Sequence, residues 1–251
     1  MLLSRIGGMS SVTRHLVSSK AVINLVISTS VSNFNIKNAV GSAYVPGATE
    51  VLLTIESGKH IGADGPALYA LDTGSGWQAG DSIKIVNHGY IAGYKGSAGN
   101  GGSYYSQSGG PGGVGGPAMN LQFPVSIDNT DGYIFSGGGG GGGGGGNGSG
   151  SGGSGHAGAA GAGSYGAVLA TTYGNPCSGT GGQTSGVGAA IGVAGAAGAG
   201  YQGGTGGSGG GGGANGGAAY QAGGGHGLAV TTNGNAITWV AGQARTYGGI
   251  T

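Results

Sequence analysis

The side chains that could do acid, base or metal chemistry are few in this chain of 251 residues, and their spacing matches no catalytic motif. The five histidines show no HExxH or other paired-ligand spacing. Asp64, Asp72 and Asp81 are the carboxylates that could line a groove and hydrolyse a polysaccharide, but aspartate near turns more commonly caps the backbone. The single cysteine, Cys177, has no disulfide partner and no obvious neighbouring base. We therefore expect no catalytic residues, no metal site and no cofactor.

Two histidines, His156 and His226, lie in the glycine-rich part of the chain and could meet in space, even across a symmetry axis. A metal would need further ligands and supporting hydrogen bonds, so this pair does not predict a metal site. The formal net charge is +1, from eight basic and seven acidic residues. Nucleic-acid binding needs a basic stripe that neutralises phosphates, and none is present. We expect no nucleic-acid partner.

Tyrosine and amide side chains, in contrast, gather in short clusters between runs of glycine. Tyrosine, serine, asparagine and glycine are typical of recognition loops, because tyrosine offers a large amphipathic contact at low entropic cost. An alternative is that these side chains plug the ends of glycine segments, and one residue could do both. The residues predicted to bind a partner are Tyr104, Tyr105, Gln107, Tyr165, Leu169, Tyr173, Asn175, Tyr201, Gln202, Tyr220 and Gln221.

The segments that position these clusters consist largely of glycine. The chain has 71 glycines, and most follow residue 100. Such a segment has too little apolar area to offset its ordering entropy by burial. It is therefore either a disordered linker or an ordered array held by backbone hydrogen bonds. Polyglycine can form an extended helix with three residues per turn, which has no internal hydrogen bonds and can pack against copies of itself. Residues 137–146 would form one such rod of about 31 Å.

The remainder of the chain predicts an all-β scaffold with almost no α-helix. Short strands rich in β-branched residues are expected at 22–28, 51–55 and 83–85. A strand, a turn with glycine or asparagine, an isoleucine and a further glycine recur at 53–62, 83–93, 125–137 and 228–242. Such weak repetition indicates stacked units, in a β-helix-like scaffold or a β-sandwich. The densest glycine lies between the last two copies, so its ends return to one scaffold, which favours the ordered array over a linker.

These patterns divide the chain into four parts. We expect a separate N-terminal segment at 1–21, a β-structured scaffold at 22–100, a glycine-rich bundle of polyglycine II helices with variable loops at 101–227, and C-terminal strands at 228–251 that return to the scaffold. The strand unit at 121–136 belongs to the scaffold although it lies within the third range.

Several of these stretches resemble a receptor-binding family of bacteriophage tail fibres. The resemblance rests on 23–28, 33–36, 51–62, 66–68, 77–93 and 230–239 in that order. The glycine-rich part is similar in kind to the polyglycine tip adhesins of tailed phages. The resemblance implies a distal tail component of the virion, at the tail tip or tail fibre. It also implies a homotrimer that contacts other tail or fibre proteins and binds a protein or glycan receptor on the host surface. The first 20 residues fall outside it, and we expect the segment 1–21 to attach the protein to the tail.

Three alternatives stand beside a non-enzymatic adhesin. The chain could be a structural tail-fibre protein without direct receptor contact. A surface-polysaccharide depolymerase predicts clustered acids, whereas the acids here end at Asp131. An ice-binding glycine-rich protein predicts a regular repeat with one flat face, whereas the glycine spacing here is irregular. The binding protein agrees best with unlike tyrosine-bearing loops joined by glycine runs.

Overall fold

The computed structural model describes residues 20–101, 109–143, 161–165, 168–170, 190–197, 210–219 and 221–251. Three parallel sheets of five strands each form its scaffold. Sheet A contains β1 (Ala21–Ile27), β4 (Thr49–Ile55), β7 (Ser82–Asn87), β10 (Val125–Asp128) and β15 (Ile237–Ala241). Sheet B contains β2 (Val31–Ser32), β5 (His60–Gly62), β8 (Tyr90–Ala92), β11 (Tyr133–Phe135) and β16 (Thr246–Tyr247). Sheet C contains β3 (Phe34–Asn35), β6 (Leu71–Asp72), β9 (Met119–Asn120), β14 (Leu228–Thr231) and β17 (Gly249–Ile250).

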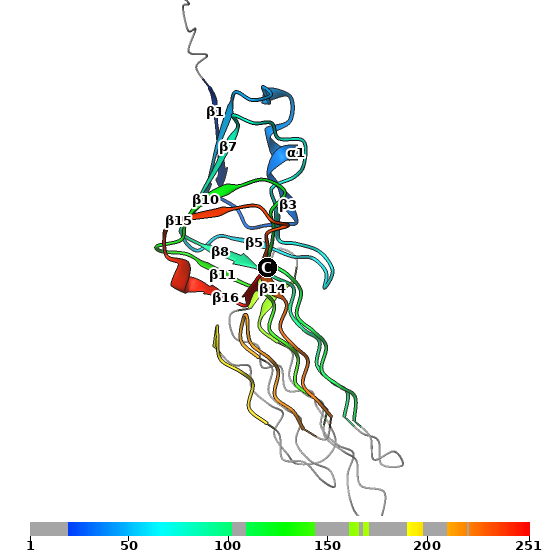
Figure 1. The fold of residues 1–251 in the computed structure, drawn as a ribbon. Coiled ribbons are helices and arrows are strands. Elements are labelled where there is room, and N and C mark those ends of the chain that lie inside the picture. The colour runs from blue at the N-terminus through cyan, green and yellow to red at the C-terminus, as the bar shows by residue number, and fades with distance from the viewer. Residues whose placement is uncertain are drawn as a thin grey trace, which may run out of the picture.

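The chain visits the three sheets in turn and so winds into a three-sided β-helix of five coils (Figure 1). Each coil takes one strand from sheet A, one from sheet B and one from sheet C, and every ladder between successive coils is parallel. The structure therefore shows the all-β class expected from the sequence, and of the two expected architectures it shows the β-helix.

Alternation along the strands of sheet A builds the core. Val51, Leu53 and Ile55 of β4 are fully buried, and in the next coil Ile83 and Ile85 occupy the registers of Val51 and Leu53. Successive side chains of a strand point to opposite faces, so every second residue of each coil enters the interior. Stacked isoleucine, leucine and valine then fill a narrow core along the β-helix axis.

The predicted position of the fourth repeat copy is wrong. The sequence pattern places it at 228–242, but the structure aligns Val125 and Ile127 with Ile237 and Trp239. Val230 lies in sheet C, beside Met119. Both 228–230 and 237–239 are short apolar strands, and alternation alone does not distinguish which sheet a short strand joins. The insertion therefore interrupts the fourth coil instead of lying between two coils.

Helix is confined to short pieces within the described ranges: α1 (Ile36–Val40), the 3₁₀ turn Gly41–Ala43 and the 3₁₀ turn Gln243–Arg245. Asn35 caps α1 by accepting a hydrogen bond from the Asn38 amide through its side chain. In the part of the chain that the structure describes, none of the helices has the length and apolar character needed to cross a lipid bilayer.

A buried carboxylate holds the connection after α1 against the second coil. Asp81 accepts hydrogen bonds from the Tyr44 hydroxyl at 2.7 Å, the Gln78 amide at 2.8 Å and the Thr49 amide at 3.0 Å. Burial alone would raise the pKa of Asp81. These three hydrogen bonds, together with the charge of Lys37, outweigh burial and hold the pKa of Asp81 below its ordinary value.

Because the folded state binds the Asp81 proton less tightly than the unfolded chain, Asp81 stabilises the fold above the unfolded pKa. That contribution is lost as the pH falls through the folded pKa. We expect the free energy of unfolding to decrease below about pH 4, and Asp81→Asn to flatten this decrease while destabilising the protein at neutral pH. Chemical denaturation at a series of pH values measures both effects. Glu50→Gln, at an exposed position of β4, is the control, and an equal slope in wild type and Asp81→Asn would refute the assignment.

Candidate functional site: the glycine-rich bundle

The glycine-rich segments leave the β-helix at one corner, between sheets B and C. In the first and last coils this corner is a single residue, Asn33 or Gly248. In the third coil it extends from 93 to 118, and in the fourth from 136 to 227. Figure 1 shows the described segments of both insertions running side by side away from the β-helix. One corner therefore carries the whole glycine-rich bundle, and both insertions begin and end on adjacent coils.

Backbone hydrogen bonds between these segments recur at every third residue. The amides of Gly93, Gly96 and Gly99 donate to the carbonyls of Phe135, Gly138 and Gly141. The amides of Gly110, Gly113 and Gly116 donate to Asn100, Ser97 and Tyr94, and those of Gly112, Gly115 and Ala118 donate to Ala222, Gly225 and Leu228. A period of three is that of an extended helix with three residues per turn, whose backbone groups all point outward.

Residues 137–143 form the centre of the bundle, and we call them the central rod. All seven are glycines, and all are buried. Their amides and carbonyls bond to six surrounding segments, at distances of 2.7–3.3 Å. The six segments are 93–101, 109–117, 161–162, 210–213, 214–217 and 221–227. Backbone groups thus take the place of side chains as the material of the core.

The absence of a Cβ is what lets the segments approach. A Cβ on Gly137 would fall on the carbonyl of Tyr94, and a Cβ on Gly140 on that of Ser97. A peripheral segment tolerates side chains at the positions that face outward. In 109–117 these are Pro111 and Val114, which are exposed and three residues apart. The sequence of the bundle therefore depends on position: glycine at every residue in the centre, and other residues at outward-facing positions of the peripheral segments.

Ser164 ties the bundle to the β-helix, and the sequence reasoning missed it. Its buried Oγ accepts from the Ala63 amide at 2.7 Å and lies 2.9 Å from the carbonyls of both Ala63 and Ala92. These residues belong to the second and third coils. The only signal for this role is a small hydroxyl residue among glycines, which is common throughout the segment.

The far end of the bundle is the end opposite the β-helix. Asn100, Gly110, Gly143 and Gln221 meet there through three successive hydrogen bonds: Gly110 N–H to Asn100, Gly143 N–H to Gly110, and Gln221 N–H to Gly143. Tyr94, Gly116, Gly137 and Gly227 form the corresponding layer next to the β-helix. Gly101 and Gly109, which flank residues 102–108, thus lie at the far end. Gln221, which follows Tyr220 in the sequence, also lies there.

Three of the predicted receptor-binding residues lie in described parts of the chain. Tyr165 ends β12 (Gly163–Tyr165), and Leu169 is a half-buried residue of β13 (Val168–Ala170); these two strands form an antiparallel hairpin. Gln221 is half-buried at the far end. Outside the described residues lie Tyr104, Tyr105, Gln107, Tyr173, Asn175, Tyr201, Gln202 and Tyr220. Their role in binding stays a prediction.

Asp72, Asp81 and His226, three of the candidates for acid–base or metal chemistry, have structural partners. Asp81 is bonded as described above. Asp72 accepts from the Gly74 amide, from Asn120 and from Gln122. The backbone amide of His226 donates to Asn215 Oδ1, and its ring Nδ1 lies 2.7 Å from the Gly227 carbonyl. Cys177 and His156 lie outside the described residues. Within the described ranges, histidine, cysteine and acidic residues nowhere form a group of three that could hold a metal ion.

Comparison with known proteins identifies the class. The sequence model of the family "Phage tail fibre adhesin Gp38" matches residues 22–251. The chain belongs to this family of phage tail fibre adhesins and is therefore a component of the virion's tail fibre. Among solved structures it is similar to the crystal structure of the gp37–gp38 adhesin tip complex of the bacteriophage S16 long tail fiber. The TM-score is 0.50 at 19% identity, over 93% of this chain and 83% of that chain, a likeness that shows the fold. No curated protein matches.

A substitution in the central rod tests whether the core of the bundle requires glycine. Gly140→Ala places a methyl group on the Ser97 carbonyl and removes no hydrogen-bonding group. We expect it to lower the free energy of unfolding by about 3 kcal/mol or more, at the upper end of overpacked cores. Gly225→Ala, in a neighbouring segment, is the matched control. Its Cβ would approach only Asn215 Oδ1, at 3.9 Å, so we expect a loss below about 1 kcal/mol. Chemical denaturation compares the two variants, and equal losses would contradict the packing described.

Proposed function

We propose that this tail fibre adhesin binds a host-surface receptor through side chains at the far end of its glycine-rich bundle. The observation that carries the proposal is the far end itself. Chain segments from both insertions arrive there on a backbone-bonded support, and the stretch 102–108, which carries Tyr104 and Tyr105, joins described residues at that end. Side chains on a rigid support lose little freedom on binding, which increases affinity.

The proposed contact is non-enzymatic. Its support is the family, whose members are adhesins, and the structural use of Asp72 and Asp81 described above. The near-neutral charge of the chain also means that binding does not depend on electrostatic steering. Tyrosine rings and amide groups would supply the contact, as they do in other recognition loops.

The β-helix offers the attachment end. Among the described strands, β1 has a neighbour on one side only, so its outer edge presents backbone groups without a described strand partner. Ile23 and Leu25 are only half-buried, whereas Val51 and Leu53 in the same registers of the second coil are fully buried. The similar structure is a complex of two tail fibre proteins. We propose that another tail fibre protein covers the first coil, with residues 1–21 contributing to the attachment. The homotrimer, the four-part division of the chain and the polyglycine II assignment of the whole range 101–227 remain predictions.

The receptor contact is tested by changing far-end tyrosines. We expect the double variant Tyr104→Ala/Tyr105→Ala to weaken binding to host cells by roughly 30-fold or more, because a tyrosine anchor contributes about 2 kcal/mol. Binding of the purified protein to whole host cells gives the affinity. Val45→Ala, on an exposed site of the β-helix, is the control and should bind as wild type does. If the double variant binds with wild-type affinity, these tyrosines do not contribute to the receptor contact.

The attachment end is tested separately. Leu25→Ser places a polar side chain on the first coil, which we propose another tail fibre protein covers. When the two proteins are co-expressed, we expect their association to be at least about tenfold weaker than with the wild type. Val240→Ser is the matched control, because Val240 lies in β15 at the opposite edge of sheet A and is 54% exposed. Circular dichroism confirms that both variants fold. Loss of association in Val240→Ser with none in Leu25→Ser would place the attachment at the other end of the β-helix.

A further inference from the structure

A hollow on the side of the β-helix, away from the far end of the bundle, has the features of a second binding site. It arises from a difference between the first two coils at the corner from which the bundle grows. The first coil turns there on Asn33 alone, whose backbone is left-handed with φ +49°. The second coil makes the same turn with a longer loop at 63–70. The longer loop extends past the tight turn and leaves a space of about 240 Å³.

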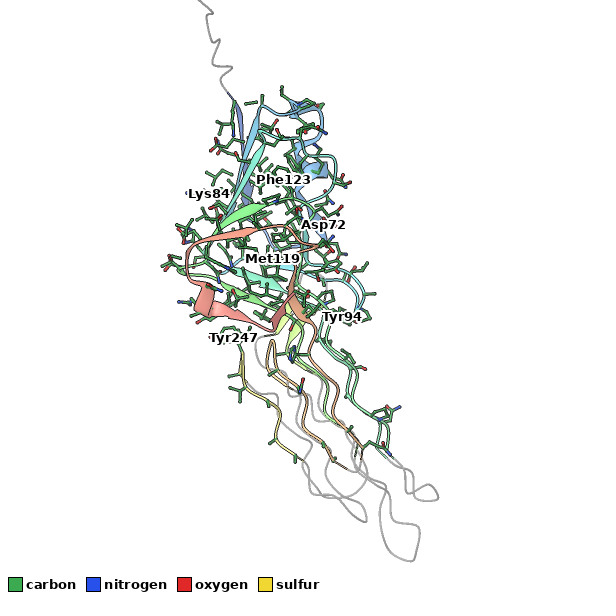
Figure 2. The ribbon with its side chains drawn as sticks, viewed as in Figure 1. Asp72, Lys84, Tyr94, Met119, Phe123 and Tyr247 are labelled. Carbon is green, nitrogen blue, oxygen red and sulfur yellow. The ribbon has the colours of Figure 1, made fainter. Side chains whose placement is uncertain are left out.

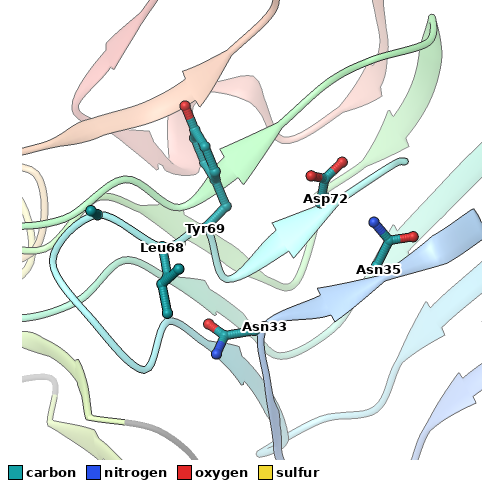
Figure 3. Close-up of a pocket in the computed structure, with 6 residues that line it drawn as sticks. Asn33, Asn35, Leu68, Tyr69 and Asp72 are labelled. Carbon is teal, nitrogen blue, oxygen red and sulfur yellow. The ribbon is translucent and has the colours of Figure 1, made fainter. Parts of the chain in front are cut away.

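Six residues line this hollow: Asn33, Asn35, Ala67, Leu68, Tyr69 and Asp72. Figure 3 shows Asn35 beside Asp72, on neighbouring strands β3 and β6, and Leu68 near Asn33. The loop is fixed to the first coil, because the Asp64 amide donates to Asn33 Oδ1 at 3.0 Å. Tyr69 is held by a hydrogen bond between its hydroxyl and Thr231 Oγ1 at 3.4 Å. The walls are thus formed before any ligand binds.

Two side-chain amide groups that lack an acceptor among the described residues, and one carboxylate, line the hollow. The side-chain oxygens of Asn33 and Asn35 accept backbone amides, but neither side-chain NH₂ group donates to any other residue that the structure describes. The Asp72 carboxylate receives N–H groups from Gly74, Asn120 and Gln122, and the Gln122 group is shared between both oxygens. A carboxylate has about four acceptor sites, and these groups make four contacts, so a ligand hydroxyl would take the place of one of the two contacts of the exposed Gln122 group. The hollow therefore presents donors and an acceptor together.

Leu68, near Asn33, adds an apolar surface to the hollow and is 48% exposed. A sugar ring has this division of surface, with hydroxyl groups at its rim and C–H groups on its faces. The volume is below the 300 Å³ or so of a pocket for a drug-sized ligand, which suits a single ring. Asp72 disfavours an anionic ligand. Lys37, the basic residue of the adjoining helix, directs its ammonium to the Tyr44 and Trp77 rings and to the Gly76 carbonyl.

We propose that this hollow binds one uncharged sugar residue of a host-surface glycan, as a contact separate from the far end of the bundle. Asn33 and Asn35 donate to ring hydroxyls, Asp72 accepts from one, and Leu68 packs against the C–H face. Affinity for a single sugar is weak, because one ring buries little area and makes few hydrogen bonds. Attachment of the adhesin to a surface that carries many copies of the glycan would raise the overall affinity.

The experiment records ¹H–¹⁵N spectra of the whole chain during titration with glucose, galactose and N-acetylglucosamine, and with glucose 6-phosphate as the anionic probe. We expect at least one uncharged sugar to shift the side-chain NH₂ signals of Asn33 and Asn35 with a Kd in the millimolar range, about tenfold below that for glucose 6-phosphate. The variant Tyr104→Ala/Tyr105→Ala should give the same shifts, which separates this site from the receptor contact.

Two variants localise the site. Asp72→Asn replaces the carboxylate acceptor with an amide, and Leu68→Ala shortens the apolar surface at an exposed position without removing a hydrogen-bonding group. Each should weaken the sugar at least about fivefold, whereas Val45→Ala should not change it. The proposal is overturned if no uncharged sugar shifts these signals up to about 50 mM. It is equally overturned if both variants bind as wild type does, or if glucose 6-phosphate binds as tightly as the uncharged sugars.

Discussion

The hydrogen bonds between backbones without side chains are the interaction on which the rest of the molecule depends. The central rod has no Cβ atom, so six segments approach closely enough to bond to its amides and carbonyls. In most protein cores apolar burial offsets the entropy of ordering the chain. Here hydrogen bonds of most backbone amides and carbonyls of the central rod have that role. The cost is intolerance to substitution, because a methyl group at Gly140 meets a carbonyl and cannot be accommodated by a change of rotamer.

Such a bundle needs an external frame, and the β-helix provides it. A glycine segment carries no side-chain pattern that could set its register, and a slip along a neighbouring segment would preserve similar bonds. The β-helix removes this ambiguity, since the segments leave and return at fixed positions on adjacent coils. Gly93 continues from β8 and residue 136 from β11, and these strands are in register through Tyr90 and Tyr133. The register of the strands therefore sets the register of the glycine segments that continue from them. Ser164 adds a further tie between the bundle and two coils of the frame.

Much of this architecture could be predicted from the sequence, and the exceptions have physical causes. β-Branched alternation at 51–55 and 83–85 predicts the strands, and the returning ends of the glycine-rich part predict an insertion. The register of the last repeat could not be predicted, because 228–230 and 237–239 have the same local pattern while only tertiary pairing assigns them to sheets C and A. The hollow beside Asp72 could not be predicted either, since it results from the unequal corner lengths of two stacked coils. For the candidate binding residues, composition alone identifies the tyrosine-rich clusters in the sequence. The far end of the bundle is a feature of the hydrogen-bonding layers, which no local pattern encodes.

Amide hydrogen exchange of the central rod tests the account most directly, because it reports whether these glycine amides are bonded in solution. Residues 137–143 have no side chains to bury, so protection can come only from their backbone partners. We expect the amides of residues 137–140, 142 and 143, which donate to described carbonyls, to exchange as slowly as those of β4 and β10, and more slowly than the amide of the exposed Val114 in a peripheral segment. Exchange of the central rod at the rate of an unstructured chain, with the β-helix still protected, would show that the glycine-rich part is a linker and would contradict the account.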